Sequence, residues 1–173
     1  MRLKKPWIGI FLLGLTPVLC GQNSTTDLSG IWQLNLAKSH PPKLGKNEIK
    51  LKPATLTIQC TATTIQMRYQ TGGRVITQTY IPDGKEKIVS QGHGGETAVK
   101  AYWKKGVLII ETSGRAYILG DLAHQSHATE LMEEVQRWSL SADGKTLSHE
   151  ESNPKSLSVF EKMPEGTSPT PAQ

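Results

Sequence analysis

Histidines are the side chains in this sequence best suited to metal binding or acid–base chemistry. Of the five present, His124 and His127 stand three residues apart, with Asp121 and Glu130 nearby. On a helix this spacing would place both imidazoles on one face, where they could hold a transition metal. We favour a polar surface loop with two solvated histidines, because no helix is indicated across residues 123–127 and no third ligand is fixed by spacing. A metal-dependent enzyme remains the alternative.

Other catalytic patterns are missing from the sequence. It holds no Gly-x-Ser-x-Gly elbow, phosphate-binding loop, dinucleotide fingerprint or paired-cysteine zinc motif. His93 stands among glycines at residues 92–95, which is typical of a loop rather than of a positioned base. We therefore assign no catalytic residue and expect no cofactor.

The N-terminus has the pattern of a secretory signal peptide over residues 1–20. Arg2, Lys4 and Lys5 precede an apolar run at 7–19, which is shorter than the roughly 20 residues that span a bilayer. Cleavage is expected after Cys20 or one residue later, giving a secreted or periplasmic protein that is not transmembrane after processing. Lipid attachment at Cys20 is the alternative, but Leu19 is not the small residue that normally precedes a lipidated cysteine.

Charge and cysteine content limit the remaining classes. Three of the 20 basic residues and none of the 15 acids lie in the leader, so the mature chain has 17 bases, a net charge of about +2. No basic face with interleaved aromatic residues indicates a nucleic-acid partner. Only Cys60 remains after processing, so we expect a hydrophobic core with no disulfide inside the chain.

The mature chain is organised around a first strand at about 30–36. Gly30 allows a tight turn into the strand, and Trp32 and Leu34 share one face of it. Further runs of alternating apolar and polar residues follow at 55–60, 64–69 and 74–81, and the first two are expected to pair as a hairpin. Residues 21–27 are expected to be flexible, 28–163 to form the domain, and the proline-containing segment 164–173 to be a disordered tail.

Turn chemistry predicts how the later strands connect. Asp83-Gly84 and Asp143-Gly144 supply the left-handed conformations that tight hairpins need. A strand is expected near 87–90, a hairpin from 97–103 and 107–112, and two last strands at 147–152 and 156–162. We expect structural roles for Gly30 and Trp32 in the first strand, for Asp143 and Gly144 in the last of these turns, and for Trp138.

One segment permits two structures. Leu131, Met132, Val135 and Trp138 have helical spacing, yet the same residues permit a strand from about 133 to 140. We favour the strand for the second half and keep a short helix over 128–134 as an alternative. The count of about eight to ten strands with short connections predicts a single all-β antiparallel meander closed into a barrel, with a β-sandwich as the alternative.

Two resemblances bear on this architecture. The segment 28–35, Lys38-Ser39, and residues 138–147 resemble a family of uncharacterised secreted bacterial β-proteins. Gly30-Ile31-Trp32 on the first strand is also similar to the Gly-x-Trp of the lipocalin or calycin group. That group implies an eight-stranded barrel with a partner arginine on the last strand, whereas residues 156–162 contain no arginine.

Three functions follow from these observations. The one we favour is an exported, non-catalytic β-domain that binds a small apolar or amphipathic ligand in its interior, with Ile58, Met67, Tyr69, Trp103 and Ile109 as candidate lining residues. The alternatives are an envelope protein–protein interaction module using the doubly apolar strand 107–110, and the metal enzyme at His124 and His127. The sequence leaves the oligomeric state open.

Overall fold

The computed structural model describes residues 25–44, 47–48, 50–92, 95–118 and 128–164. The expected leader at 1–20 with Cys20, the residues His93, His124 and His127, and residues 165–173 of the expected tail lie outside this part of the chain. All regular structure in it is β-strand, and it contains no helix with the length and apolar character needed to cross a bilayer. The strands are β1 Gly30–Leu34, β2 Lys43–Leu44, β3 Asn47–Glu48, β4 Ala54–Cys60, β5 Ile65–Thr71, β6 Arg74–Tyr80, β7 Glu86–Gly92, β8 Gly95–Lys104, β9 Val107–Ile118, β10 Ala128–Leu140, β11 Thr146–Ser152 and β12 Lys155–Lys162.

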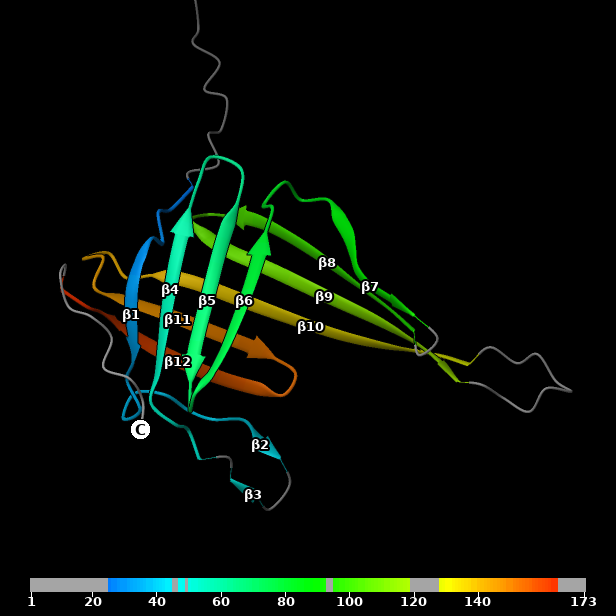
Figure 1. Ribbon diagram of the computed structural model, residues 1–173, viewed down its shortest axis with the longest axis horizontal. Helices are drawn as coiled ribbons and strands as arrows, with labels where there is room; N and C mark the ends of the chain where they lie inside the picture. The colour runs from blue at the N-terminus through cyan, green and yellow to red at the C-terminus, as the bar shows by residue number, and fades with distance from the viewer. Residues whose placement is uncertain (1–24, 45–46, 49, 93–94, 119–127, 165–173) are drawn as a thin grey trace, which may run out of the picture.

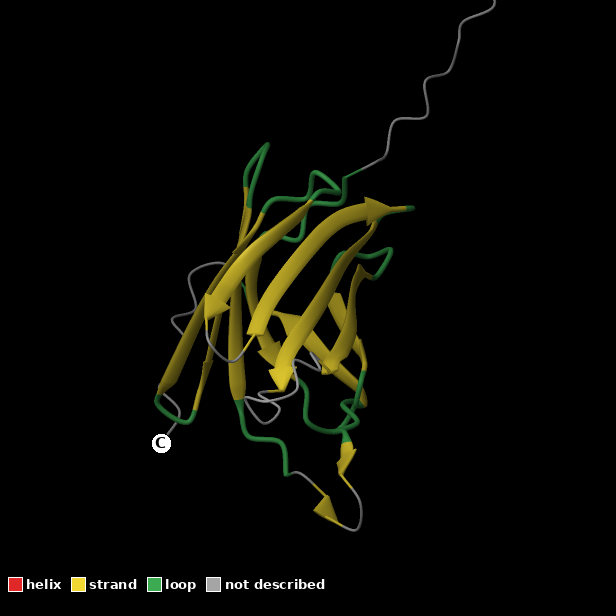
Figure 2. Ribbon diagram, turned by 90° about the vertical axis from the view of Figure 1, so that its right-hand side faces the viewer, coloured by secondary structure: helices red, strands yellow, loops and turns green. Residues whose placement is uncertain are grey.

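Ten of the strands form one antiparallel meander, which confirms the predicted fold class. Their order is β6-β5-β4-β1-β12-β11-β10-β9-β8-β7, so β1 joins the two halves of the sheet by pairing with both β4 and β12. Figure 1 shows β4, β5 and β6 crossing in front of β10, β11 and β12. Seen from the side, the two halves lie face to face, and the small β2–β3 hairpin projects beyond one end (Figure 2).

The sheet is not closed, which corrects the expectation of a closed barrel. Strands β6 and β7 follow each other in the chain but are the two edges of the sheet. The Asp83-Gly84 turn has the expected left-handed glycine, with φ of 72° at Gly84, yet the two strands that it joins do not pair with each other. The Gly84 amide donates to the Ala101 carbonyl at 2.9 Å, so the connection is tied to β8 instead of closing the β6–β7 edge.

The remaining hairpin predictions are confirmed, and the helix alternative is wrong. Strands β4 and β5, β8 and β9, and β10 and β11 pair as neighbours. Strand β10 runs through all of 128–140 and pairs with β9 at eleven positions, because the long β9 offers backbone partners along this whole stretch. At the β10–β11 turn, Asp143 accepts from the Lys145 amide, and Gly144 has φ of 69°.

Trp32 on β1 is one of the fully buried side chains of the hydrophobic core. Its indole nitrogen donates to the Leu28 carbonyl at 3.1 Å. The Lys162 ammonium lies 5.5 Å from the centre of the Trp32 ring. The two residues thus form a cation–π contact. The lysine lies on β12, the last strand, where the calycin resemblance implied an arginine. A Cβ at Gly30 would stand 3.1 Å from Lys162 Cε, so the glycine makes room for this contact.

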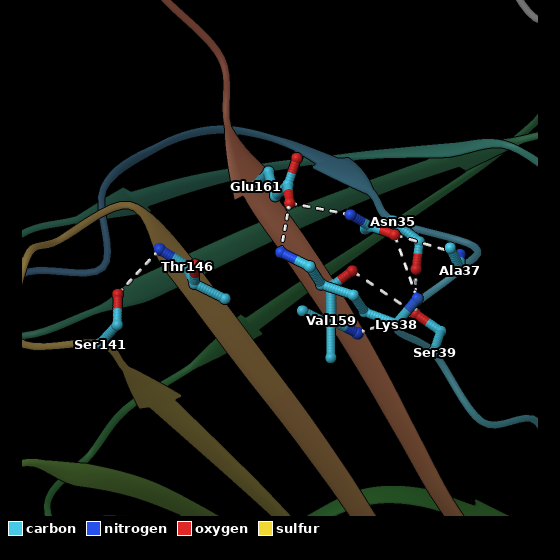
Figure 3. A network of polar contacts seen from close by, with 8 residues as sticks. All are labelled: Asn35, Ala37, Lys38, Ser39, Ser141, Thr146, Val159 and Glu161. Carbon is cyan, nitrogen blue, oxygen red and sulfur yellow. Dashed lines mark hydrogen bonds and ion pairs between the residues drawn. The ribbon is translucent and has the colours of Figure 1, made fainter.

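A polar network fastens the segment after β1 to β12 (Figure 3). The Ser39 hydroxyl donates to the Asn35 carbonyl at 2.7 Å and accepts from the Val159 amide at 3.0 Å. Nearby, Glu161 accepts from the Asn35 amide group at 2.8 Å and pairs with Lys38 at 2.9 Å. Because Ser39 is buried, its two bonds satisfy backbone groups that water does not reach.

Candidate ligand cavity

A cavity of about 330 Å³ lies between the two halves of the sheet. Strands β4, β5 and β6 supply one wall, and β10, β11 and β12 supply the other. Side chains alternate along each strand, so every second residue of these six strands can face the cavity. Its lining is Leu56, Met67, Tyr69, Ile76, Gln78, Gln136, Trp138, His149, Glu151, Ser158 and Phe160.

One part of the lining is apolar. Leu56, Met67 and Phe160 are buried and belong to the main hydrophobic core. Ile76 comes from the edge strand β6 and leaves 53 % of its surface exposed. The cavity therefore extends from the core toward the open β6 edge, where an apolar molecule could enter without crossing a hydrogen-bonded ladder.

The part of the lining that comes from β10 and β11 holds two buried nitrogens without partners in the described part of the chain. The rings of Trp138 and His149 stack with centres 3.8 Å apart and planes 12° from parallel. Within the described part of the chain, neither Trp138 Nε1 nor His149 Nε2 has a hydrogen-bond partner. Buried polar atoms are almost always satisfied, so this unsatisfied pair is the feature of the cavity that most needs an explanation.

The surroundings of His149 keep its imidazole neutral. Burial lowers its pKa from 6.5 to about 4, because the charged form loses hydration that nothing replaces. The nearest carboxylate oxygen, Oε1 of Glu151, lies 3.7 Å from Nε2, beyond hydrogen-bond distance. The other oxygen of Glu151 accepts from the Ser156 hydroxyl at 2.7 Å.

Two tyrosines on the facing wall also stay uncharged. The pKa of Tyr69 is raised, first by burial and then by the negative charge of Glu151 across the cavity. Burial, with a smaller contribution from Glu134, raises the pKa of Tyr80 to about 12. The Tyr80 hydroxyl donates to Gln78 Oε1 at 2.9 Å, which orients one of the cavity amides.

The charge of the lining is one-sided. Glu151 is the acidic residue of the set, and no lysine or arginine occurs among the described residues that line the cavity. Arg137 precedes Trp138 on β10, so alternation directs its exposed side chain to the opposite face. The site thus offers hydrogen-bonding atoms and one carboxylate, but no cation for an anionic ligand.

The candidate lining residues from the sequence fall into three groups. Met67 and Tyr69 line the cavity. Ile58 is buried in the adjoining core, and Trp103 packs against that core. Ile109 lies on the other face of β9 from Leu108 and Ile110, between Tyr102 and Arg137, so it does not face the cavity.

Sequence reasoning missed the polar wall. Trp138 was assigned only a structural role, and Gln136, His149, Glu151 and Ser158 were not considered as lining residues. The signal was present in part, because 147–152 was expected to be a strand and alternation places His149 and Glu151 on the face of the buried Leu147. The sequence does not indicate that this face of β11 lies opposite β4, β5 and β6 across the cavity.

Two other parts of the chain carry less of what a binding site needs. A larger depression of about 860 Å³ lies near the β11–β12 turn, but Arg137, Glu150 and Lys155 in its lining are exposed, and it contains none of the unpaired buried atoms. His124 and His127 lie outside the described residues, and among those residues no group of three metal-ligating side chains comes together.

Comparison with known proteins gives a fold but no family. No family model and no curated protein matches this sequence. Solved structures that are similar include the REP1-NXSQ fatty acid transporter (9 % identity, TM-score 0.53, 79 % of this chain and 96 % of that one) and Caenorhabditis elegans lipid binding protein 8 (14 %, 0.51, 79 % and 95 %). Echinococcus granulosus fatty-acid-binding protein 1 is similar at 13 % identity and a TM-score of 0.52, over 79 % and 97 % of the two chains. This chain shares its fold with these proteins. At these identities the likeness concerns the fold alone.

Proposed function

We propose that this protein is an exported, non-catalytic binding protein that holds a small apolar or amphipathic molecule between the two halves of its sheet. The observation that carries the proposal is the cavity with two unpaired buried nitrogens, Trp138 Nε1 and His149 Nε2. Leaving a buried donor or acceptor unsatisfied costs about 1–3 kcal/mol per group. A ligand headgroup would remove that cost on binding.

The dimensions and lining of the cavity support this proposal. Its volume of about 330 Å³ falls at the lower end of the roughly 300–1,000 Å³ of small-molecule sites. Apolar side chains with a few convergent polar groups are the usual lining of such sites. Lipid-binding proteins of the same fold type, named above, support the assignment at the level of fold.

Export belongs to the proposal because of residues 1–20. A basic start followed by an apolar run is the pattern of a cleaved signal peptide. Removal of this segment would leave a protein that meets its ligand outside the cytoplasm. The alternative product, anchored by lipid at Cys20, would present the same cavity at a membrane surface.

Native mass spectrometry of the full-length chain, expressed in a bacterial host and recovered after export, tests both the export and the ligand binding that we propose. The mass of the polypeptide tells whether cleavage follows Cys20 or Gly21, or whether a lipid has been added. A discrete extra mass that leaves on denaturation is the expected ligand. An uncleaved chain would contradict export.

A matched pair of variants tests the cavity itself. Gln78→Trp places an indole in the cavity, whereas Thr77→Trp places it on the opposite, exposed face of β6. With N-phenyl-1-naphthylamine as a fluorescent apolar probe, we expect Gln78→Trp to weaken binding at least about tenfold and Thr77→Trp to change it by less than about twofold. Equal binding by both variants, or none by the wild type, would contradict an interior site.

A second candidate function rests on the open edges of the sheet. Val75 on β6 and Ile88 and Val89 on β7 are 48 %, 58 % and 61 % exposed, and both strands lack a neighbour on one side. An extended segment of an envelope protein could add to such an edge. Tagged wild-type protein should then retain an envelope partner that Val89→Lys loses. Retention of the same partner by both would contradict binding through β7.

A further inference from the structure

We infer that the cavity selects an uncharged amphiphile with a hydroxyl headgroup over a fatty carboxylate of the same length. This inference rests on the proposed function and names the class of ligand for the same cavity. It is drawn from the hydrogen-bonding atoms left unpaired at Trp138 and His149, from the position of Glu151, and from the absence of a cation among the described lining residues.

The Trp138 indole requires a ligand atom that accepts a hydrogen bond. An indole N–H can only donate, and Trp138 Nε1 is buried without an acceptor in the described part of the chain. A hydroxyl oxygen, an ether oxygen or a carboxylate oxygen could each accept this bond. The tryptophan alone therefore does not separate alcohols from acids.

His149 and Glu151 favour a ligand hydroxyl over a ligand carboxylate. A neutral imidazole has one N–H and one lone pair, and a carboxylate only accepts. A ligand hydroxyl could accept from Trp138 and at the same time donate to His149 Nε2 or to the Glu151 oxygen that lies 3.7 Å from it. An ionised ligand carboxylate has no proton to donate and would lie beside a second negative charge, in surroundings where burial weakens screening.

Basic residues on the strands that form the cavity lie outside its lining. Arg74 shares a face of β6 with Ile76 and Gln78, but its side chain is exposed and does not belong to the lining. Lys162 lies over the Trp32 ring and does not belong to the lining. Arg137 is exposed on the opposite face of β10. An anionic headgroup in the cavity would thus be desolvated without a paired charge, which is strongly unfavourable.

Three ligands of the same chain length provide the test. Decan-1-ol can donate and accept, decyl methyl ether can only accept, and decanoate is an anion at pH 7.5. Their dissociation constants are measured by displacement of N-phenyl-1-naphthylamine from the exported full-length protein. We expect decan-1-ol to bind about tenfold or more tightly than decanoate, and several-fold more tightly than the ether.

A matched pair of variants assigns the selectivity to one residue. Glu151→Gln removes the negative charge from the cavity and keeps an oxygen that can accept from Ser156. Glu150→Gln makes the same change at an exposed neighbour on the other face of β11. We expect Glu151→Gln to reduce the preference for decan-1-ol over decanoate to about threefold or less, and Glu150→Gln to leave it unchanged.

The measurements distinguish failure of the headgroup inference from failure of the proposed function. If decanoate binds as tightly as decan-1-ol, or if Glu151→Gln leaves the preference unchanged, the headgroup inference is wrong while an interior binding site stands. If the apolar dye binds but the ether equals the alcohol, donation to His149 or Glu151 is wrong. If neither the dye nor any of the three ligands binds, the proposed function fails with it.

Discussion

Acid is expected to destabilise this fold through His149 well before most carboxylates titrate. The imidazole is almost fully enclosed, with its side chain 12 % exposed, and it stacks on Trp138. Burial lowers its pKa from 6.5 to about 4. The folded protein therefore keeps His149 neutral in a pH range where the unfolded chain takes up a proton.

The sign and the size follow from this difference. Stability from His149 is fully present above the unfolded pKa of 6.5, falls as the pH drops below it, and levels off below about 4. Each pH unit between the two pKa values corresponds to about 1.4 kcal/mol. Between pH 7.5 and pH 4 the folded state should lose about 3 kcal/mol, a large share of the roughly 5–15 kcal/mol typical of a domain.

Urea unfolding followed by circular dichroism at pH 7.5, 6.5, 5.5 and 4.5 measures this loss. His149→Phe keeps a ring against Trp138 but cannot titrate, so the wild type should lose about 2–3 kcal/mol more than the variant over this range. The comparison cancels carboxylates whose pKa values are lowered in the folded state and which also cost stability in acid, namely Asp27, Asp83, Glu111, Asp143 and Glu161.

One result would refute this reasoning. Parallel curves for the wild type and His149→Phe would show that His149 is protonated in the folded protein, and the argument from burial would then be wrong.

Three further predictions concern single contacts, each measured as the free energy of unfolding in urea at pH 7.5. Ser39→Ala should cost about 1–3 kcal/mol, because it leaves the buried Val159 amide without an acceptor; a neutral result would mean that water reaches it. Trp32→Phe should cost about 1–3 kcal/mol, because it removes the hydrogen bond to the buried Leu28 carbonyl. Trp103→Phe, at a half-buried tryptophan, serves as its comparison and should cost less. Gly144→Ala should cost about 1–2 kcal/mol from backbone strain alone, since among the described residues no atom beyond the neighbouring residues in the chain lies within 4 Å of the added Cβ. Unchanged stability would contradict a left-handed residue there.

The local pattern of the sequence was enough for most of the strands. Alternation at 55–60 and 64–69 predicted β4 and β5, and the Asp-Gly turn at 143–144 predicted the hairpin of β10 and β11. These features depend on neighbouring residues, because side-chain period and turn conformation are set within a few positions. The same kind of reasoning failed at 128–134, where helical spacing and strand alternation coexist and pairing with β9 decides between them.

By itself, the sequence determined the class of fold and the hairpins β4–β5, β8–β9 and β10–β11. Only the tertiary structure decided that β6 and β7 remain unpaired edges, that Ile109 faces away from the interior, and that Trp138, His149 and Glu151 meet Met67 and Tyr69 across one cavity. The physical reason is that alternation identifies two faces of a strand without saying which is enclosed. That choice depends on contacts between strands distant in the chain, and at Ile109 both faces of the strand are apolar.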